Sequence, residues 1–125
     1  MSRRLFPVLI DLRYKNVVVL AGRLSCEDKV LRIMHALSSC TNHLTLFSPS
    51  PSGRLKEEAG TIPYSLTQKE YDREDLYGAD VVILTGEDTL LADEVHAACR
   101  TLGIRLCIPS EPWRSDFILP DGFFE

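Results

Sequence analysis

Residues 16–29 read NVVVLAGRLSCEDK, which joins an apolar run, a turn and a pair of acidic residues. The β-branched run 16–21 is typical of a strand buried on both faces of a parallel sheet. Gly22 opens the turn. Ser25 and Asp28 have the spacing of a capping box, so a helix is expected to begin here. A strand, a tight turn and a helix in this order are the opening of a βαβ unit.

The rest of the chain continues this alternation of strand and helix signals. Residues 38–42 end the first helix, and a second is expected over 88–102, with Gly103 in the left-handed conformation that ends helices. The charged residues 68–77 are expected to form an exposed helix or an ordered loop. Further strands are expected at 5–10, 43–47, 61–64, 80–85, 104–108 and 117–119. The pattern predicts an α/β fold, a Rossmann-like doubly wound parallel sheet in one domain over residues 1–125.

Composition narrows the classes of protein. The chain has 125 residues, of which 45% are hydrophobic, with 14 Lys and Arg against 18 Asp and Glu. This length suits one domain, and the hydrophobic content argues against intrinsic disorder. The negative net charge and the lack of a basic cluster argue against nucleic acid or an anionic membrane as the partner. No run approaches the ~18–20 apolar residues that span a bilayer.

Short signals near the N-terminus and at the cysteines have ordinary explanations. Pro7 and Asp11 interrupt the first apolar run, which favours a strand over a signal peptide. The four cysteines lack metal-ligand spacing, and three of them lie in apolar stretches, where a free cysteine packs as a small core residue. The three histidines likewise lack a second ligand at metal spacing. We therefore expect a reduced, cytoplasmic protein without a metal site.

The loops after the strands are where a doubly wound sheet binds ligands. The expected site therefore comprises residues 22–26, 48–53, 85–88 and 109–115. A dinucleotide loop has the pattern G-x-G-x-x-G or A, but Ala21, Arg23 and Cys26 occupy the glycine positions here. Arg23 places a side chain where bare backbone meets the phosphates. The helix start still offers N–H groups to an anion, and Arg23 could itself pair with a phosphate.

The ribose-binding acid is also absent from its usual place after the second strand. No acidic residue occurs between Asp28 and Glu57. Ser48-Pro49 is either a solvated turn or a place where the backbone, Ser48 and Ser50 bind the ribose. The residues alone thus predict a Rossmann-like domain with a degenerate phosphate loop.

Further motifs occur in a fixed order along the chain. It opens with LFPVLIDL at 5–12, then carries LTLFSP at 44–49, DLYGADVVILTGED at 75–88 and SDFILP at 115–120. Together with residues 17–29, these motifs resemble the N-terminal dehydrogenase domain of siroheme synthases, the precorrin-2 dehydrogenase and sirohydrochlorin ferrochelatase family. The resemblance covers residues 5–120.

The resemblance implies an activity, a cofactor and a set of site residues. The activity is the NAD-linked oxidation of a tetrapyrrole, precorrin-2, to sirohydrochlorin, and some members of the family also insert iron. Ser110 falls at the position of the family's catalytic carboxylate, and Glu111 could replace it only if the loop shifts by one residue. A serine hydroxyl without an activating group is a poor base. The implied NAD-binding residues are Ala21, Gly22, Arg23, Leu24, Ser25, Ser48, Thr85, Gly86 and Glu87.

Two hypotheses follow. The first is a precorrin-2 dehydrogenase-like enzyme of siroheme biosynthesis with impaired catalysis. The second is a noncatalytic relative, a pseudoenzyme that binds a tetrapyrrole, a nucleotide or a protein, which the residues at Ala21, Arg23 and Ser110 favour. In either case we expect Arg23 and Ser110 to face one cleft. The family's C-terminal dimerisation and helical region is absent apart from residues 121–125, so we expect the exposed edge to bind a second copy or a partner protein.

Overall fold

The sheet of the protein is parallel and doubly wound, as the sequence predicts. The computed structural model describes residues 4–22 and 25–120. Five strands lie in the order β3-β2-β1-β4-β5, and every neighbouring pair is parallel. The chain therefore winds outward from β1 in one direction and from β4 in the other. The strands are β1 (Asn16–Ala21), β2 (His43–Ser48), β3 (Ser65–Gln68), β4 (Val81–Thr85) and β5 (Arg105–Cys107).

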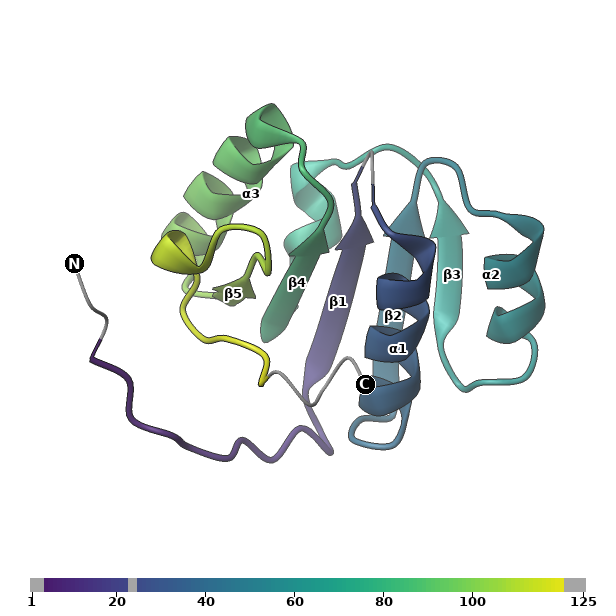
Figure 1. The fold of residues 1–125 in the computed structure, drawn as a ribbon, viewed down its shortest axis with the longest axis horizontal. Helices are drawn as coiled ribbons and strands as arrows, with labels where there is room; N and C mark the ends of the chain where they lie inside the picture. The colour runs from purple at the N-terminus through teal and green to yellow at the C-terminus, as the bar shows by residue number, and fades with distance from the viewer. Residues whose placement is uncertain (1–3, 23–24, 121–125) are drawn as a thin grey trace.

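Helices cover both faces of this sheet (Figure 1). The helices α1 (Glu27–Ser38) and α2 (Gly53–Ala59) pack on one face. The helix α3 (Thr89–Leu102) and the 3-10 helix η1 (Arg73–Leu76) pack on the other. A second 3-10 helix, η2 (Pro112–Arg114), follows β5. None of the helices within the described residues is both long and apolar enough to span a membrane.

Strand β1 divides its side chains between the two cores. Val17 and Val19 belong to the cluster under α1, whereas Val18 and Leu20 belong to the cluster under α3. All four are buried. Successive side chains of a strand point to opposite faces, so a continuous apolar run is required where both faces are covered. This arrangement explains why residues 16–21 carry the clearest strand signal of the chain.

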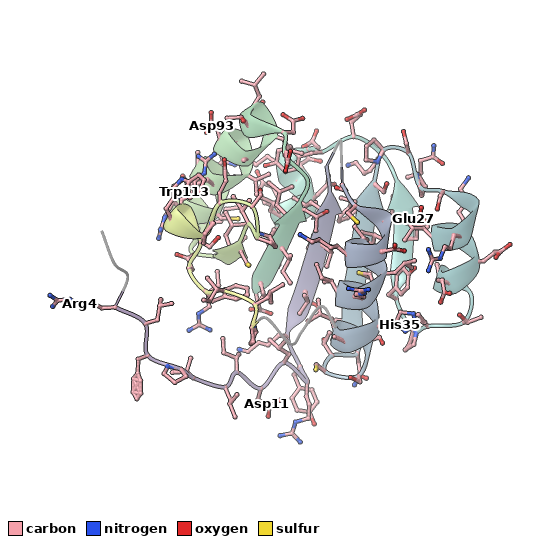
Figure 2. All side chains as sticks on the ribbon, in the orientation of Figure 1. Arg4, Asp11, Glu27, His35, Asp93 and Trp113 are labelled. Carbon is pink, nitrogen blue, oxygen red and sulfur yellow. The ribbon has the colours of Figure 1, made fainter. Side chains whose placement is uncertain are left out.

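Three of the expected strands are wrong. Residues 61–64 form a turn, because Ile62 and Tyr64 pack into the core under α2 and the Tyr64 hydroxyl donates to the Leu55 carbonyl at 3.2 Å. The strand β3 begins only at Ser65. Residues 5–10 are irregular and exposed, and Figure 2 shows Arg4 and Asp11 on a segment that stands away from the sheet. Residues 117–119 pack partly against the core without pairing as a strand.

The motif at 115–116 closes the outer edge of β5. The Leu106 amide donates to Asp116 Oδ2 at 2.9 Å, and the Asp116 amide donates back to the Leu106 carbonyl at 2.7 Å. The Ile108 amide donates to Ser115 Oγ at 2.8 Å. These side chains satisfy backbone groups that an edge strand otherwise leaves open. Asp116 also forms an ion pair with Arg100 on α3 at 3.2 Å.

The cysteines divide equally between core and surface. Cys99 and Cys107 are buried, whereas Cys26 and Cys40 are exposed, and all four are free thiols. Burial raises the pKa of Cys99 and of Cys107 to about 11. A thiol in apolar surroundings resists ionisation and therefore reacts slowly. Two cysteines thus pack as core residues, rather than the three that the sequence indicated.

Candidate dinucleotide site

The carboxyl ends of three strands bring several of the predicted site residues together. Ala21, Ser48 and Thr85 are the last residues of β1, β2 and β4, and all three are buried. Ala21 is paired with Thr85 in the register of β1 and β4. The order of strands reverses between β1 and β4, which is where doubly wound sheets bind ligands.

Gly22 is required by a close approach of two backbone segments. Its amide donates to the Thr85 carbonyl at 3.1 Å. A Cβ at this position would lie 2.9 Å from that carbonyl oxygen and 3.2 Å from Leu91 Cδ2. The turn after β1 therefore fits tightly against the end of β4. Arg23 and Leu24, which are also predicted for this loop, lie outside the described residues.

Ser25 holds the same turn to β4 instead of capping α1. Its Oγ lies 2.6 Å from the Gly22 carbonyl and 2.9 Å from Thr85 Oγ1. The N-cap of α1 is Cys26, which makes no side-chain cap. The predicted capping box at Ser25 is therefore wrong, because the serine hydroxyl is engaged at the end of β4. No described side chain caps the start of α1, and its first-turn N–H groups are donors of the kind that bind phosphate oxygens.

A cavity of about 330 Å³ lies between α1 and the loop that joins β2 to α2. We call it the serine cavity. Ser48 and Ser50 line it, as the hypothesis of ribose binding requires, and so do Gly22 and Ser25. Hydroxyl groups and a carboxylate are suitable partners for ribose hydroxyls. The full lining is Ala21, Gly22, Ser25, Glu27, Val30, Ser48, Pro49, Ser50, Ser52 and Leu55.

The sequence analysis missed Glu27 as a lining residue, and it included Ser52 only as part of the expected loop 48–53. The Ser52 hydroxyl donates to Glu27 Oε1 and accepts from the Leu55 amide at 3.2 Å, which makes Ser52 the N-cap of α2. A serine before the helix-forming residues 54–59 is a signal for this helix. Nothing in the sequence indicates that Ser52 meets Glu27.

A second cavity, of about 230 Å³, lies on the α3 side of the same turn. Gly22 lines both this cavity and the serine cavity. Tyr71 and Lys69 line it as well. Burial raises the pKa of Tyr71 to about 12, so its hydroxyl stays protonated and can donate a hydrogen bond at neutral pH.

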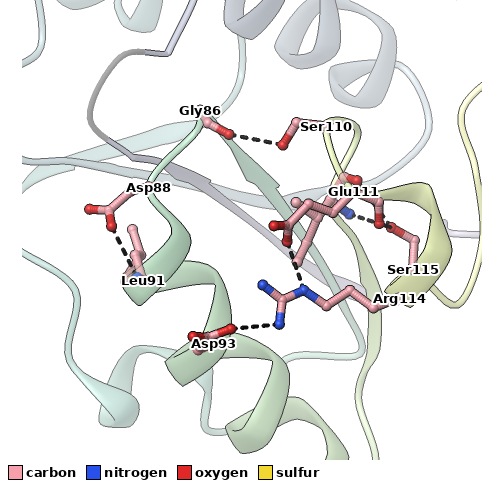
Figure 3. A network of polar contacts seen from close by, with 9 residues as sticks. Gly86, Asp88, Leu91, Asp93, Ser110, Glu111, Arg114 and Ser115 are labelled. Carbon is pink, nitrogen blue, oxygen red and sulfur yellow. Dashed lines mark hydrogen bonds and ion pairs between the residues drawn. The ribbon is translucent and has the colours of Figure 1, made fainter.

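Ser110 lies beside the loop that follows β4, as the family position implies. Its Oγ donates to the Gly86 carbonyl at 3.1 Å (Figure 3). Ser110, Thr85, Gly86 and Glu87 line one small cavity of about 100 Å³, together with Cys26 and Lys29 from the start of α1. The Ser110 hydroxyl donates its hydrogen bond to a backbone carbonyl, and a carbonyl oxygen is too weak a base to take the proton. The contact with the Gly86 carbonyl therefore does not activate the Ser110 hydroxyl.

Glu111 is engaged in an ion pair that fixes its loop to α3. Its Oε2 accepts from Arg114 Nε at 2.7 Å, and the same guanidinium pairs with Asp93 at 2.7 Å (Figure 3). The hydrogen bond to Glu111 is the main reason why the pKa of Arg114 is raised. The side chain of Glu111 thus anchors residues 111–114. That Arg23 and Ser110 face one cleft stays a prediction, since Arg23 lies outside the described residues.

Known proteins share both the sequence pattern and the fold. Residues 8–121 match the family described as "Putative NAD(P)-binding". A siroheme synthase from Psychrobacter sp. (strain PRwf-1) is 26% identical over 115 residues, which are 92% of this chain and 23% of that protein.

Among solved structures, the fold is similar to that of "SirC, precorrin-2 dehydrogenase", with a TM-score of 0.75 and 14% sequence identity. The similarity covers 93% of this chain and 54% of that one. The chain therefore spans less than a quarter of the siroheme synthase and about half of the dehydrogenase. The tight Gly22 turn and the serine cavity lie at the carboxyl ends of the strands, where doubly wound sheets bind ligands. The chain belongs to the "Putative NAD(P)-binding" family.

Proposed function

We propose that this domain binds NAD at the carboxyl ends of β1, β2 and β4 and acts in siroheme biosynthesis as a precorrin-2 dehydrogenase-like protein with impaired catalysis. The carrying observation is the contact of Gly22 with Thr85, which leaves no room for a Cβ in the tight turn after β1, the place of the phosphate loop in doubly wound folds. The match to an NAD(P)-binding family supports the cofactor. The likeness to a siroheme synthase and a precorrin-2 dehydrogenase supports the substrate class.

The residues of the chain have separate roles in this proposal. Bound NAD supplies a hydride acceptor for the oxidation. Gly22 lets the turn lie close to β4, and Ser48 and Ser50 offer hydroxyls to a ribose. The turn at Gly86 and the residue Ser110 form the wall next to which the substrate would lie.

Proton removal is the step that the chain is poorly equipped to perform. A general base must hold a lone pair free for the proton and have a pKa near the working pH. The Ser110 hydroxyl donates a hydrogen bond to the Gly86 carbonyl, and Glu111 is paired with Arg114. We therefore expect cofactor binding to be retained while turnover is slow. The same observation favours the second candidate, a noncatalytic relative that binds a tetrapyrrole, a nucleotide or a protein.

Calorimetric titration of the full chain with NAD⁺ tests the cofactor. We expect a micromolar dissociation constant. Binding at that affinity with about 1 mM NAD⁺ should stabilise the fold by roughly 4 kcal/mol and raise the Tm by several degrees. A chain that gives neither binding heat nor a change in Tm at this concentration would contradict the proposal.

A pair of double variants tests the catalytic part. Replacing Ser110 with Asp and Arg23 with Gly restores the family's residues, and we expect faster oxidation of precorrin-2 because a carboxylate can accept a proton. The matched control carries Ser110→Asn with the same Arg23→Gly change, since it has a similar shape without the charge. Equal rates for the two variants, with NAD⁺ bound by both, would reject the dehydrogenase in favour of the noncatalytic relative.

A further inference from the structure

We propose that Glu27 supplies the carboxylate that binds the adenosine ribose, and that this residue makes the chain prefer NAD over NADP. The inference rests on the proposed NAD site and adds to it a specificity residue. Doubly wound folds usually place this acid after the second strand, where this chain has only serines and prolines at 48–52. Here the acid comes from the first turn of α1 instead.

The position of Glu27 carries the proposal. The side chain is half-buried and lines the serine cavity with Ser48, Ser50 and Ser52. Figure 2 shows Glu27 on the side of α1 that faces α2. The carboxylate therefore shares one cavity with the end of β2, although Glu27 and Ser48 are far apart in the sequence.

The carboxylate is also held in a defined orientation. Ser52 Oγ accepts from the Leu55 amide, which directs its proton to Glu27 Oε1. The other oxygen, Oε2, has no hydrogen-bond partner among the described residues. An ionised carboxylate has lone pairs for several hydrogen bonds, so one fixed oxygen leaves the other to accept from a ribose hydroxyl. A fixed acceptor binds more tightly than a mobile one because less conformational freedom is lost.

The negative charge in the serine cavity favours NAD over NADP. Glu27 is the one charged side chain among the described residues that line the cavity. The guanidinium of Arg54, on the adjacent helix, pairs with Asp28 at 2.8 Å and is not part of the lining. The 2′-hydroxyl of NAD can donate to a carboxylate. The 2′-phosphate of NADP would instead bring like charges together, which disfavours that ligand.

Titration of the full chain with NAD⁺ and with NADP⁺ tests this assignment. We expect the wild-type chain to bind NAD⁺ at least about tenfold more tightly. Glu27→Gln should weaken NAD⁺ binding by roughly tenfold, because a hydrogen bond to a charged acceptor is lost, and should bring the two affinities close together. The control is Glu57→Gln on the exposed surface of α2, which makes the same charge change outside the cavity and should keep the wild-type ratio.

The possible results separate the two proposals. A Glu27→Gln chain that keeps the wild-type preference would overturn the role of Glu27 and leave the NAD site standing, as would a wild-type chain that prefers NADP⁺. A wild-type chain that binds neither dinucleotide would overturn the NAD site itself. Thermal unfolding shows whether each variant is folded. If Glu27→Gln is not, Ser52→Ala retains the charge and should weaken NAD⁺ binding several-fold while keeping the preference over NADP⁺, and unchanged NAD⁺ affinity would contradict the inference.

Discussion

Replacing Gly22 with alanine should lower the free energy of unfolding by roughly 1–3 kcal/mol, the usual cost of overpacking. The new Cβ would lie 2.9 Å from the Thr85 carbonyl oxygen, a distance at which the backbone must shift. That oxygen accepts the Gly22 amide at 3.1 Å, so moving it away weakens the hydrogen bond that joins the turn to β4. Leu91 Cδ2, at 3.2 Å, restricts the movement of the methyl group in another direction.

Urea unfolding followed by circular dichroism measures this effect, with Gly53→Ala as the matched control. A Cβ at Gly53 meets nothing within 4 Å, and the residue begins α2. Alanine favours a helix more than glycine does, so the control should be neutral or stabilised by up to about 1 kcal/mol. If both variants unfold at the same urea concentration, the close approach at Gly22 does not constrain the turn.

Asp116→Ala should destabilise the protein by roughly 1–3 kcal/mol, because it leaves a buried strand amide without an acceptor. The amide belongs to Leu106, which is buried in the core. Its hydrogen exchange should also become faster, since the bond that protects it is lost. Urea unfolding gives the free energy, and nuclear magnetic resonance of the Leu106 amide gives the exchange rate.

Asp116→Asn separates the hydrogen bond from the charge. Asparagine retains a side-chain oxygen that can accept from the Leu106 amide, but it loses the ion pair with Arg100. Ion pairs with exposed partners contribute little to stability. We therefore expect the asparagine variant to lie close to the wild type. A loss as large as that of the alanine variant would assign the effect to the charge and contradict our explanation.

The sequence predicts the centre of this fold well and its margins poorly. The strands β1 and β4 are covered on both faces, so their continuous apolar runs identify them to within one residue. The helix α3 is equally clear, because Asp88 accepts from the Leu91 amide at its start and Gly103 adopts a φ of 70° at its end. In each case the local pattern and the tertiary packing require the same residues.

Edge elements lack this agreement between pattern and packing. The edge strand β3 reads Ser-Leu-Thr-Gln and is mostly exposed, so hydrophobic periodicity does not identify it. The apolar residues just before it resemble a strand in sequence, but Tyr64 is buried and Ile62 partly buried beneath α2 in a turn. Leu9 shows the converse, since it lies in an apolar run and is fully exposed. An apolar pattern predicts burial only where another element covers it.

The candidate site was predictable where it depends on topology and not where it depends on pairs of distant side chains. Parallel strands end at one edge of the sheet, which was enough to bring Ser48 and Thr85 to the same region. The contact of Glu27 with Ser52 depends on how α1 and α2 pack, and residues 25 positions apart in sequence give no signal for it. The same limit applies to Glu111. Arg114 binds both Glu111 and Asp93 on α3, and the sequence gives no signal for this bridge.

The closed edge at β5 has a consequence for aggregation. The outward amides of Leu106 and Ile108 already donate to side chains of the same chain, so an unrelated polypeptide finds no free donors there to extend the sheet. Fibrillar growth by strand addition would have to start at the opposite margin, on β3. That strand has only four residues, so it offers few backbone groups for an added strand to pair with. Two unequal margins thus protect the same sheet, one by capping and the other by its short length.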